Sequence, residues 1–158
     1  MKRILLILAV GLGLSPSIFA AQMPPAPAGT FSIAVIPDTQ HYKGQKTKSE
    51  PNSTKALTNP VFKAYTSWIA DNLKSQRIVF VSHVGDIVDI NNRAQWTIAR
   101  RHMDRLHGQV PYGISVGNHD MTGAGDSSLF QEFFPAKRFV KFDWYGGTFK
   151  PANGRPAV

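Results

Sequence analysis

Short apolar runs alternate with amphipathic segments through the middle of the chain. Phe31 to Ile36, Ile78 to Val81 and Val110 to Val116 are compact apolar runs bounded by turn residues, which predicts three buried strands. Between them, apolar residues recur at helical spacing over 60–75 and again between Asn92 and Gly108, which predicts two helices.

The starts of both helices carry capping signals. Asn59 followed by Pro60 reads as an N-cap with proline at the first helical position, and Asn92 caps the second helix in the same way. Trp68 and Trp96 share helical spacing with other apolar residues, so we expect both in the core. One face of the second helix is also expected in the core: Trp96, Ala99, Met103 and Leu106.

The order strand, helix, strand, helix, strand predicts an α/β fold with parallel strands in a doubly wound sheet. In such sheets, ligands bind beyond the carboxyl ends of the strands. Further along, 128–134 predicts a short helix ended by Pro135, and Phe139 to Trp144 predicts another strand. Residues 145–158 contain turn residues but no closing element, so we expect the fold to be truncated.

The N-terminus predicts export. Lys2 and Arg3 precede an apolar run and a small-residue region, so residues 1–20 are interpreted as a signal peptide cleaved after Ala20. We therefore expect a secreted or periplasmic protein without a stable membrane span after signal removal. Residues 21–30 are rich in Pro and Ala and predict an extended linker, which leaves one domain over 31–158.

Composition limits the partners. The formal net charge is +8, which favours anionic substrates, but no aromatic and basic interleaving or groove-reading module indicates nucleic acid. The chain has no cysteine, which excludes disulfides and thiolate metal sites.

Three polar segments follow the three predicted strands. They contain Asp38 and Gln40, then Asp86 and Asp89, then Asn118, His119 and Asp120. Carboxylate and amide oxygens with an imidazole are hard to borderline ligands, suited to Mg, Mn, Fe or Zn. The sequence therefore predicts a metal site at the carboxyl edge of the sheet.

In order and spacing these segments resemble the first three motifs of the calcineurin-like metallophosphoesterases, Asp-x-His, Gly-Asp-x-x-Asp and Gly-Asn-His-Asp/Glu. The resemblance extends from Phe31 to Asp120. It implies that 31–158 is the N-terminal portion of an α/β/β/α sandwich with a βαβαβ core. It also implies a phosphoesterase that hydrolyses phosphomonoester or phosphodiester bonds by attack of a metal-bridging hydroxide, with two divalent ions about 4 Å apart.

The resemblance assigns roles residue by residue. Asp38 would bind the first metal, Asp86 would bridge both metals, and Asn118 would bind the second. His119 would contact the substrate phosphate or protonate the leaving oxygen, oriented by Asp89 or Asp120.

Two departures from the family pattern change the expectation. Gln40 stands where the family has histidine, a weaker oxygen ligand that shifts metal preference toward Mn or Mg, with Mn favoured. The family's later histidines, including a Gly-His-x-His motif, are absent from this sequence. Either the chain is a partial form, or it is a non-catalytic metal- and phosphate-binding remnant.

Other basic and imidazole side chains are assigned mainly structural roles. His83 is expected in the core or at a strand end, and His102 and His107 are expected to face solvent. The helix face with Arg100, Arg101 and Arg105 is interpreted as solvated. Lys43, Lys46 and Lys48 either steer phosphates toward Asp38 or simply aid solubility.

Overall fold

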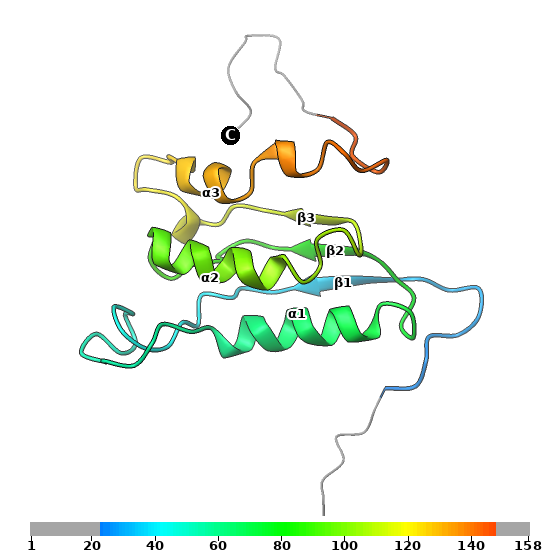
Figure 1. Ribbon diagram of the computed structural model, residues 1–158, viewed down its shortest axis with the longest axis horizontal. Coiled ribbons are helices and arrows are strands. Elements are labelled where there is room, and N and C mark those ends of the chain that lie inside the picture. The colour runs from blue at the N-terminus through cyan, green and yellow to red at the C-terminus, as the bar shows by residue number, and fades with distance from the viewer. Residues whose placement is uncertain (1–22, 148–158) are drawn as a thin grey trace, which may run out of the picture.

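A computed structural model of the chain describes residues 23–147. The predicted signal peptide and the last eleven residues therefore lie outside the described part. Three parallel strands form one sheet in the order β1-β2-β3, which confirms the α/β fold class and the parallel strands (Figure 1). The strands are β1 (Ser32–Ile36), β2 (Ile78–His83) and β3 (Tyr112–Ile114). The helices are α1 (Pro60–Asn72), α2 (Arg93–Met103) and α3 (Ser128–Phe133), with 3-10 turns η1 (Asn118–Asp120) and η2 (Ala136–Arg138).

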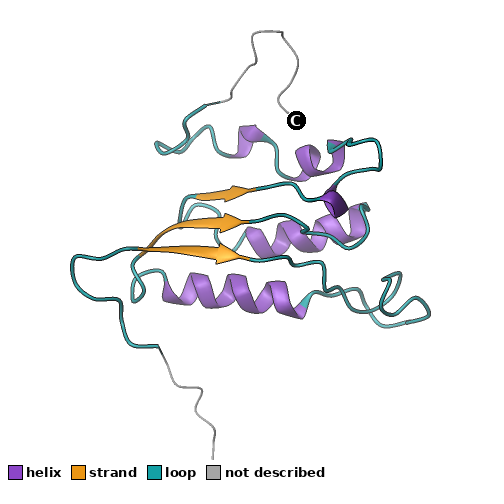
Figure 2. Cartoon of the chain, turned by 180° about the vertical axis from the view of Figure 1, so that it is seen from behind, coloured by secondary structure: helices purple, strands orange, loops and turns teal. Residues whose placement is uncertain are grey.

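Both long helices cover the same face of the sheet. Seen from behind, the strands lie in front of α1 and α2 (Figure 2). Two successive right-handed crossovers between neighbouring strands place both helices on one side. Within the described residues the sheet is therefore covered on one face only, which differs from the expected doubly wound arrangement. Ile33, Val35 and Phe80 accordingly remain exposed.

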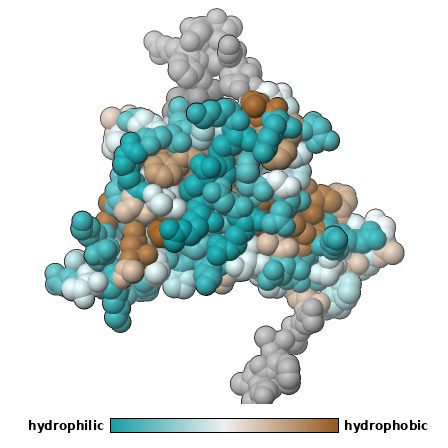
Figure 3. All heavy atoms as spheres, in the orientation of Figure 1, coloured by the Kyte–Doolittle hydropathy of each residue, from teal (hydrophilic) through white to brown (hydrophobic). Residues whose placement is uncertain are grey.

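The core lies between the sheet and the helices. Ile36 and Val81 from the sheet meet Phe62 and Ile69 from α1, and all four are buried. The burial predicted for Trp96, Ala99, Met103 and Leu106 is confirmed. The predicted helix end at Gly108 is wrong, because α2 ends at Met103 and Leu106 lies in the turns that follow. The outward surface over the helices is mainly hydrophilic (Figure 3).

The predicted helix starts are confirmed by side-chain caps. Asn59 Oδ1 accepts from Phe62 N at 2.9 Å, and Asn92 Oδ1 accepts from Gln95 N at 3.0 Å. These bonds satisfy amide groups that the first helical turn leaves without partners.

The strand predicted over 139–144 is wrong. The segment forms turns, and its half-buried aromatic rings pack on one another and on His107 instead of joining the sheet. Phe142 and Trp144 stack with their ring centroids 4.9 Å apart. The aromatic residues of this segment therefore pack against other rings, and the segment does not form a strand.

Three burial expectations are also wrong. Trp68 is 44% exposed because the buried stripe of α1 follows Phe62, Thr66 and Ile69, which leaves position 68 beside it. His102 is only 6% exposed and packs 5.5 Å from the Phe62 ring. His107 is half-buried among Tyr112, Phe139 and Phe142.

No helix within residues 23–147 is long and apolar enough to cross a membrane.

Candidate metal and phosphate site

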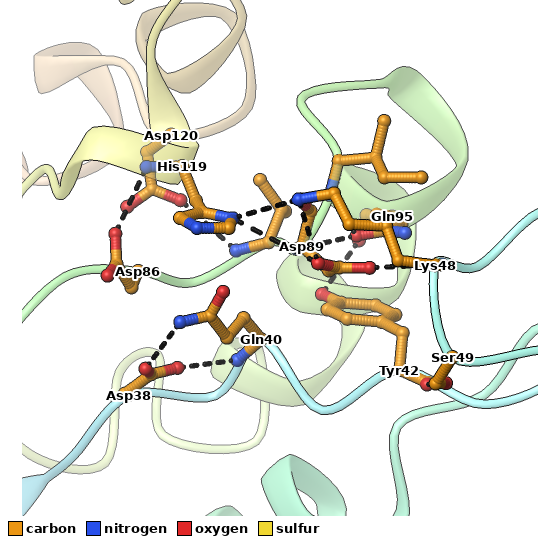
Figure 4. A network of polar contacts seen from close by, with 12 residues as sticks. Asp38, Gln40, Tyr42, Lys48, Ser49, Asp86, Asp89, Gln95, His119 and Asp120 are labelled. Carbon is orange, nitrogen blue, oxygen red and sulfur yellow. Dashed lines mark hydrogen bonds and ion pairs between the residues drawn. The ribbon is translucent and has the colours of Figure 1, made fainter.

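The three polar segments converge at the carboxyl ends of the strands. Thr39 N, in the first segment, donates to Asp86 O at 3.1 Å, and His119 N, in the third, donates to Asp86 Oδ1 at 3.1 Å. Asp86 is therefore the centre at which all three segments meet (Figure 4). Because β1, β2 and β3 run parallel, their carboxyl ends lie at one edge and bring these side chains together.

Two glycines allow the second and third segments to touch. A Cβ on Gly85 would lie 2.8 Å from Gly117 N, and a Cβ on Gly117 would collide with Oδ1 and N of Asp86. Gly85 also has φ of +103°, a conformation that side chains rarely adopt. The backbone contact at the site therefore requires glycine at both positions.

Asp86 itself adopts a strained backbone conformation. Its φ is +50°, which lies in the left-handed region that non-glycine residues seldom occupy. Such conformations cost free energy and persist where the surrounding structure holds them. Here the contacts with Thr39 and His119 hold the Asp86 backbone and carboxylate in place.

Asp38 and Gln40 form a local pair on the first segment. Asp38 Oδ1 accepts from Gln40 N at 2.9 Å, and Asp38 Oδ2 lies 2.6 Å from Gln40 Nε2 (Figure 4). The Asp38 carboxylate is thereby fixed in direction, and the Gln40 amide lies beside it. Both side chains belong to the same edge of the sheet as Asp86, because Thr39 between them is bonded to Asp86 O.

A buried network behind the site was missed by sequence reasoning. His83 Nδ1 accepts from Gly85 N at 3.2 Å, and Nε2 lies 3.0 Å from Thr39 Oγ1, which in turn donates to Ile87 O. Asn59 Nδ2 donates to Thr39 O at 2.6 Å and so links the network to the cap of α1. His83 is fully buried, as expected for a core histidine, and burial lowers its pKa to about 4.

His119 lies against Asp89. Its Nδ1 is 3.0 Å from the Asp89 main-chain O and 4.0 Å from Asp89 Oδ1. The Asp89 backbone is held from α2, because Asp89 N donates to Gln95 Oε1 at 2.8 Å. Of the two carboxylates expected to orient His119, the structure places Asp89 beside the ring.

Asp120 has a different environment. Its carboxylate accepts from Gly117 N at 2.9 Å, from Ile87 N at 2.9 Å and from Val88 N at 3.1 Å. Burial raises the pKa of Asp120, while these backbone hydrogen bonds oppose that rise. The Asp120 carboxylate therefore links the backbones of the second and third segments by hydrogen bonds.

The donor set can be compared with the metals expected from the sequence. Within residues 23–147 no group of three or more histidine, aspartate or glutamate side chains could hold a metal ion. Asp38 and Asp86 supply two carboxylates, and Gln40 and Asn118 add only amide oxygens. Carboxylate and amide oxygens are the donors that hard cations such as Mg²⁺ and Mn²⁺ prefer. Within the described residues they do not form a complete metal site.

Comparisons with known proteins give distant similarities. No family model matches the chain. It is 36% identical over 137 residues to the uncharacterized protein YvnB of Bacillus subtilis (strain 168), a match that covers 84% of this chain and 10% of that protein. The chain thus spans about a tenth of the length of this curated relative. Among solved structures it is similar to the purple acid phosphatase PPD1 from yellow lupin (Lupinus luteus) seeds, with a TM-score of 0.43 and 21% identity over 70% of this chain and 21% of that one.

Proposed function

We propose that this chain carries the N-terminal part of the site of a metal-dependent phosphoesterase that hydrolyses phosphomonoester or phosphodiester bonds. The observation that carries the proposal is the meeting of three strand-end segments at Asp86, which the Gly85 and Gly117 contact permits. The meeting gathers carboxylates, amides and an imidazole at one edge, the groups that metal-assisted ester hydrolysis requires.

Each side chain has a role in this proposal. Asp38, Gln40, Asp86 and Asn118 would hold divalent cations, with Mn²⁺ favoured for one ion and further ligands needed for a second. When bound, the cations supply Lewis-acid stabilisation of the phosphate charge and activation of water.

His119 would contact the substrate phosphate or protonate the leaving oxygen. A main-chain carbonyl only accepts, so His119 Nδ1 carries the proton that bonds to Asp89 O, and Nε2 remains for the substrate. Nε2 donates only when the ring carries both protons, and the neutral ring accepts there. Asp89 fixes this ring orientation.

The wider context of the activity is also part of the proposal. Export by the N-terminal signal would place the protein in the periplasm or outside the cell. The chain spans about a tenth of the length of the curated relative, and phosphoester hydrolysis by the whole protein is part of the same proposal.

The proposal is tested with the full-length protein and two chromogenic esters, p-nitrophenyl phosphate and bis-p-nitrophenyl phosphate, in the presence of Mn²⁺. We expect hydrolysis of one or both esters, loss of activity with a chelator, and at least about a hundredfold loss for Asp86→Asn, which removes the central carboxylate charge. Asp71→Asn, on the exposed side of α1, is the matched control and should retain activity. The proposal fails if neither ester is hydrolysed, or if Asp86→Asn keeps the activity of the control.

A non-catalytic binding module is the second candidate. It is favoured by the small donor set, since two of the four proposed ligands are neutral amides. Calorimetric titration with Mn²⁺ separates the candidates: one weak site without ester hydrolysis supports the binding module, and two stoichiometric sites contradict it.

A further inference from the structure

The polar connection between β1 and α1 is folded rather than extended. Lys43 and Thr58 form an antiparallel bridge with reciprocal backbone hydrogen bonds of 2.9 Å, and Gln45 N donates to Lys55 O at 2.8 Å. Thr47 is buried, and its Oγ1 donates to Gly44 O at 2.9 Å. These bonds give the loop backbone a defined path, which fixes where each of its side chains begins.

This shape brings Lys48 to the site. Lys48 N donates to Asp89 Oδ2 at 3.3 Å, and Lys48 Nζ lies 3.1 Å from Asp89 Oδ1 (Figure 4). The same Nζ is 3.4 Å from Nδ1 of His119, the residue proposed to meet the substrate. The Lys48 ammonium group, from a loop far from His119 in the sequence, therefore lies next to His119.

The hydrogen bonds leave this cation available. His119 Nδ1 donates to Asp89 O, so it has no lone pair for Lys48 and the two nitrogens face each other as donors. An ammonium group has three protons, and among the described residues Asp89 Oδ1 is the acceptor that Nζ contacts. The Lys48 side chain is also 57% exposed, so a ligand can reach it.

The negative charge of the site explains why a cation at Lys48 would help to bind an anion. Asp86 accepts from His119 N, Asp89 lies beside the His119 ring, and Asp38 follows β1 at the same edge of the sheet, so this edge carries negative charge that opposes an anionic substrate. A compact ammonium charge beside His119 offsets this repulsion and attracts phosphate oxygens. The attraction is greater for a dianion than for a monoanion, because Coulomb energy scales with charge.

We propose that Lys48 is a substrate-binding residue that contacts the non-bridging oxygens of the phosphate and favours dianionic phosphomonoesters over monoanionic phosphodiesters. The proposal rests on the proposed function and deepens it by naming a substrate class. Lys48 would exchange part of its contact with Asp89 for the phosphate oxygens.

Calorimetric binding of inorganic phosphate and of dimethyl phosphate to the full-length protein tests the proposal, each measured with and without Mn²⁺. We expect Lys48→Met to weaken phosphate binding about tenfold and dimethyl phosphate binding about threefold, in line with the charge of each ligand. Lys48→Arg, which keeps the charge, should stay within about threefold of the wild type. Lys55→Met, on the same loop and exposed, is the matched control and should change neither affinity.

Unchanged phosphate affinity in Lys48→Met, equal losses for both ligands, or no phosphate binding by the wild type would each overturn the proposal. Thermal unfolding of each variant checks that the fold is kept. Mn²⁺ binding and ester hydrolysis by the wild type report separately on the proposed function. Failure of Lys48 to influence phosphate binding is therefore distinguishable from failure of the metal site.

Discussion

At the scale of single residues, Gly117 determines how closely the third segment approaches Asp86. Any side chain at this position would collide with Asp86 Oδ1 and N. We expect Gly117→Ala to displace the Asp86 carboxylate and to weaken Mn²⁺ binding at least tenfold in a calorimetric titration. Gly123→Ala is the matched control, because a Cβ there meets nothing within 4 Å. Equal Mn²⁺ affinity in the two variants would contradict the claim that Gly117 positions the Asp86 carboxylate for metal binding.

His83 makes the stability of the fold depend on pH. Burial lowers its pKa from 6.5 to about 4, so the unfolded chain binds more protons than the folded chain between these values. The contribution of His83 is complete above pH 6.5 and is lost as the pH falls toward 4, a change on the order of 3 kcal/mol. His102, whose pKa burial likewise lowers to about 4, adds a change of the same sign.

Urea unfolding at several pH values checks this dependence. In His83→Gln the free energy of unfolding should vary less steeply between pH 4 and pH 6.5 than in the wild type. His41→Gln, at an exposed position, should leave the slope unchanged. An unaltered slope in His83→Gln would show that the buried network does not carry the effect.

At the scale of elements, the N-cap residues of α1 and α2 differ in the number of hydrogen bonds that they form. Asn59 and Asn92 each accept from a helix amide, but Asn59 also donates to Thr39 O and so ties α1 to the first polar segment. We expect Asn92→Ala to cost about 1 kcal/mol of unfolding free energy, as for an ordinary cap. Asn59→Ala should cost about 2 to 3 kcal/mol, because a buried carbonyl also loses its partner.

Chemical denaturation of both variants measures this difference, with Asn52→Ala, at an exposed loop position, as the control. If Asn59→Ala and Asn92→Ala were equally costly, the link between α1 and Thr39 would contribute nothing to stability.

At the scale of the whole molecule, the two faces of the sheet differ in burial. Ile36 is 1% exposed beneath the helices, whereas Val35 beside it is 60% exposed on the other face. We expect Ile36→Thr to lower the free energy of unfolding by about 2 kcal/mol or more, and Val35→Thr to change it by less than about 0.5 kcal/mol. Urea unfolding of the two variants checks this, and a comparable loss in both would show that the second face is covered as well.

Much of the fold followed from local patterns. Helix starts at Asn59 and Asn92 and parallel strands ending before Asp38, Asp86 and Asn118 were predictable, because capping and apolar periodicity are local properties. The burial of His102, the exposure of Trp68 and the turns over 139–144 were not, because each depends on which neighbour packs there.

The sequence by itself determined the donor types and their positions after three strands, since residue identity and strand order fix both. Only the tertiary structure decided that Gly85 and Gly117 meet, that Asp120 braces backbones while Asp89 lies beside His119, and that the loop brings Lys48 to the same place. The physical reason is that the donor atoms of a side chain are fixed by residue identity, whereas contacts between side chains depend on how distant segments pack together.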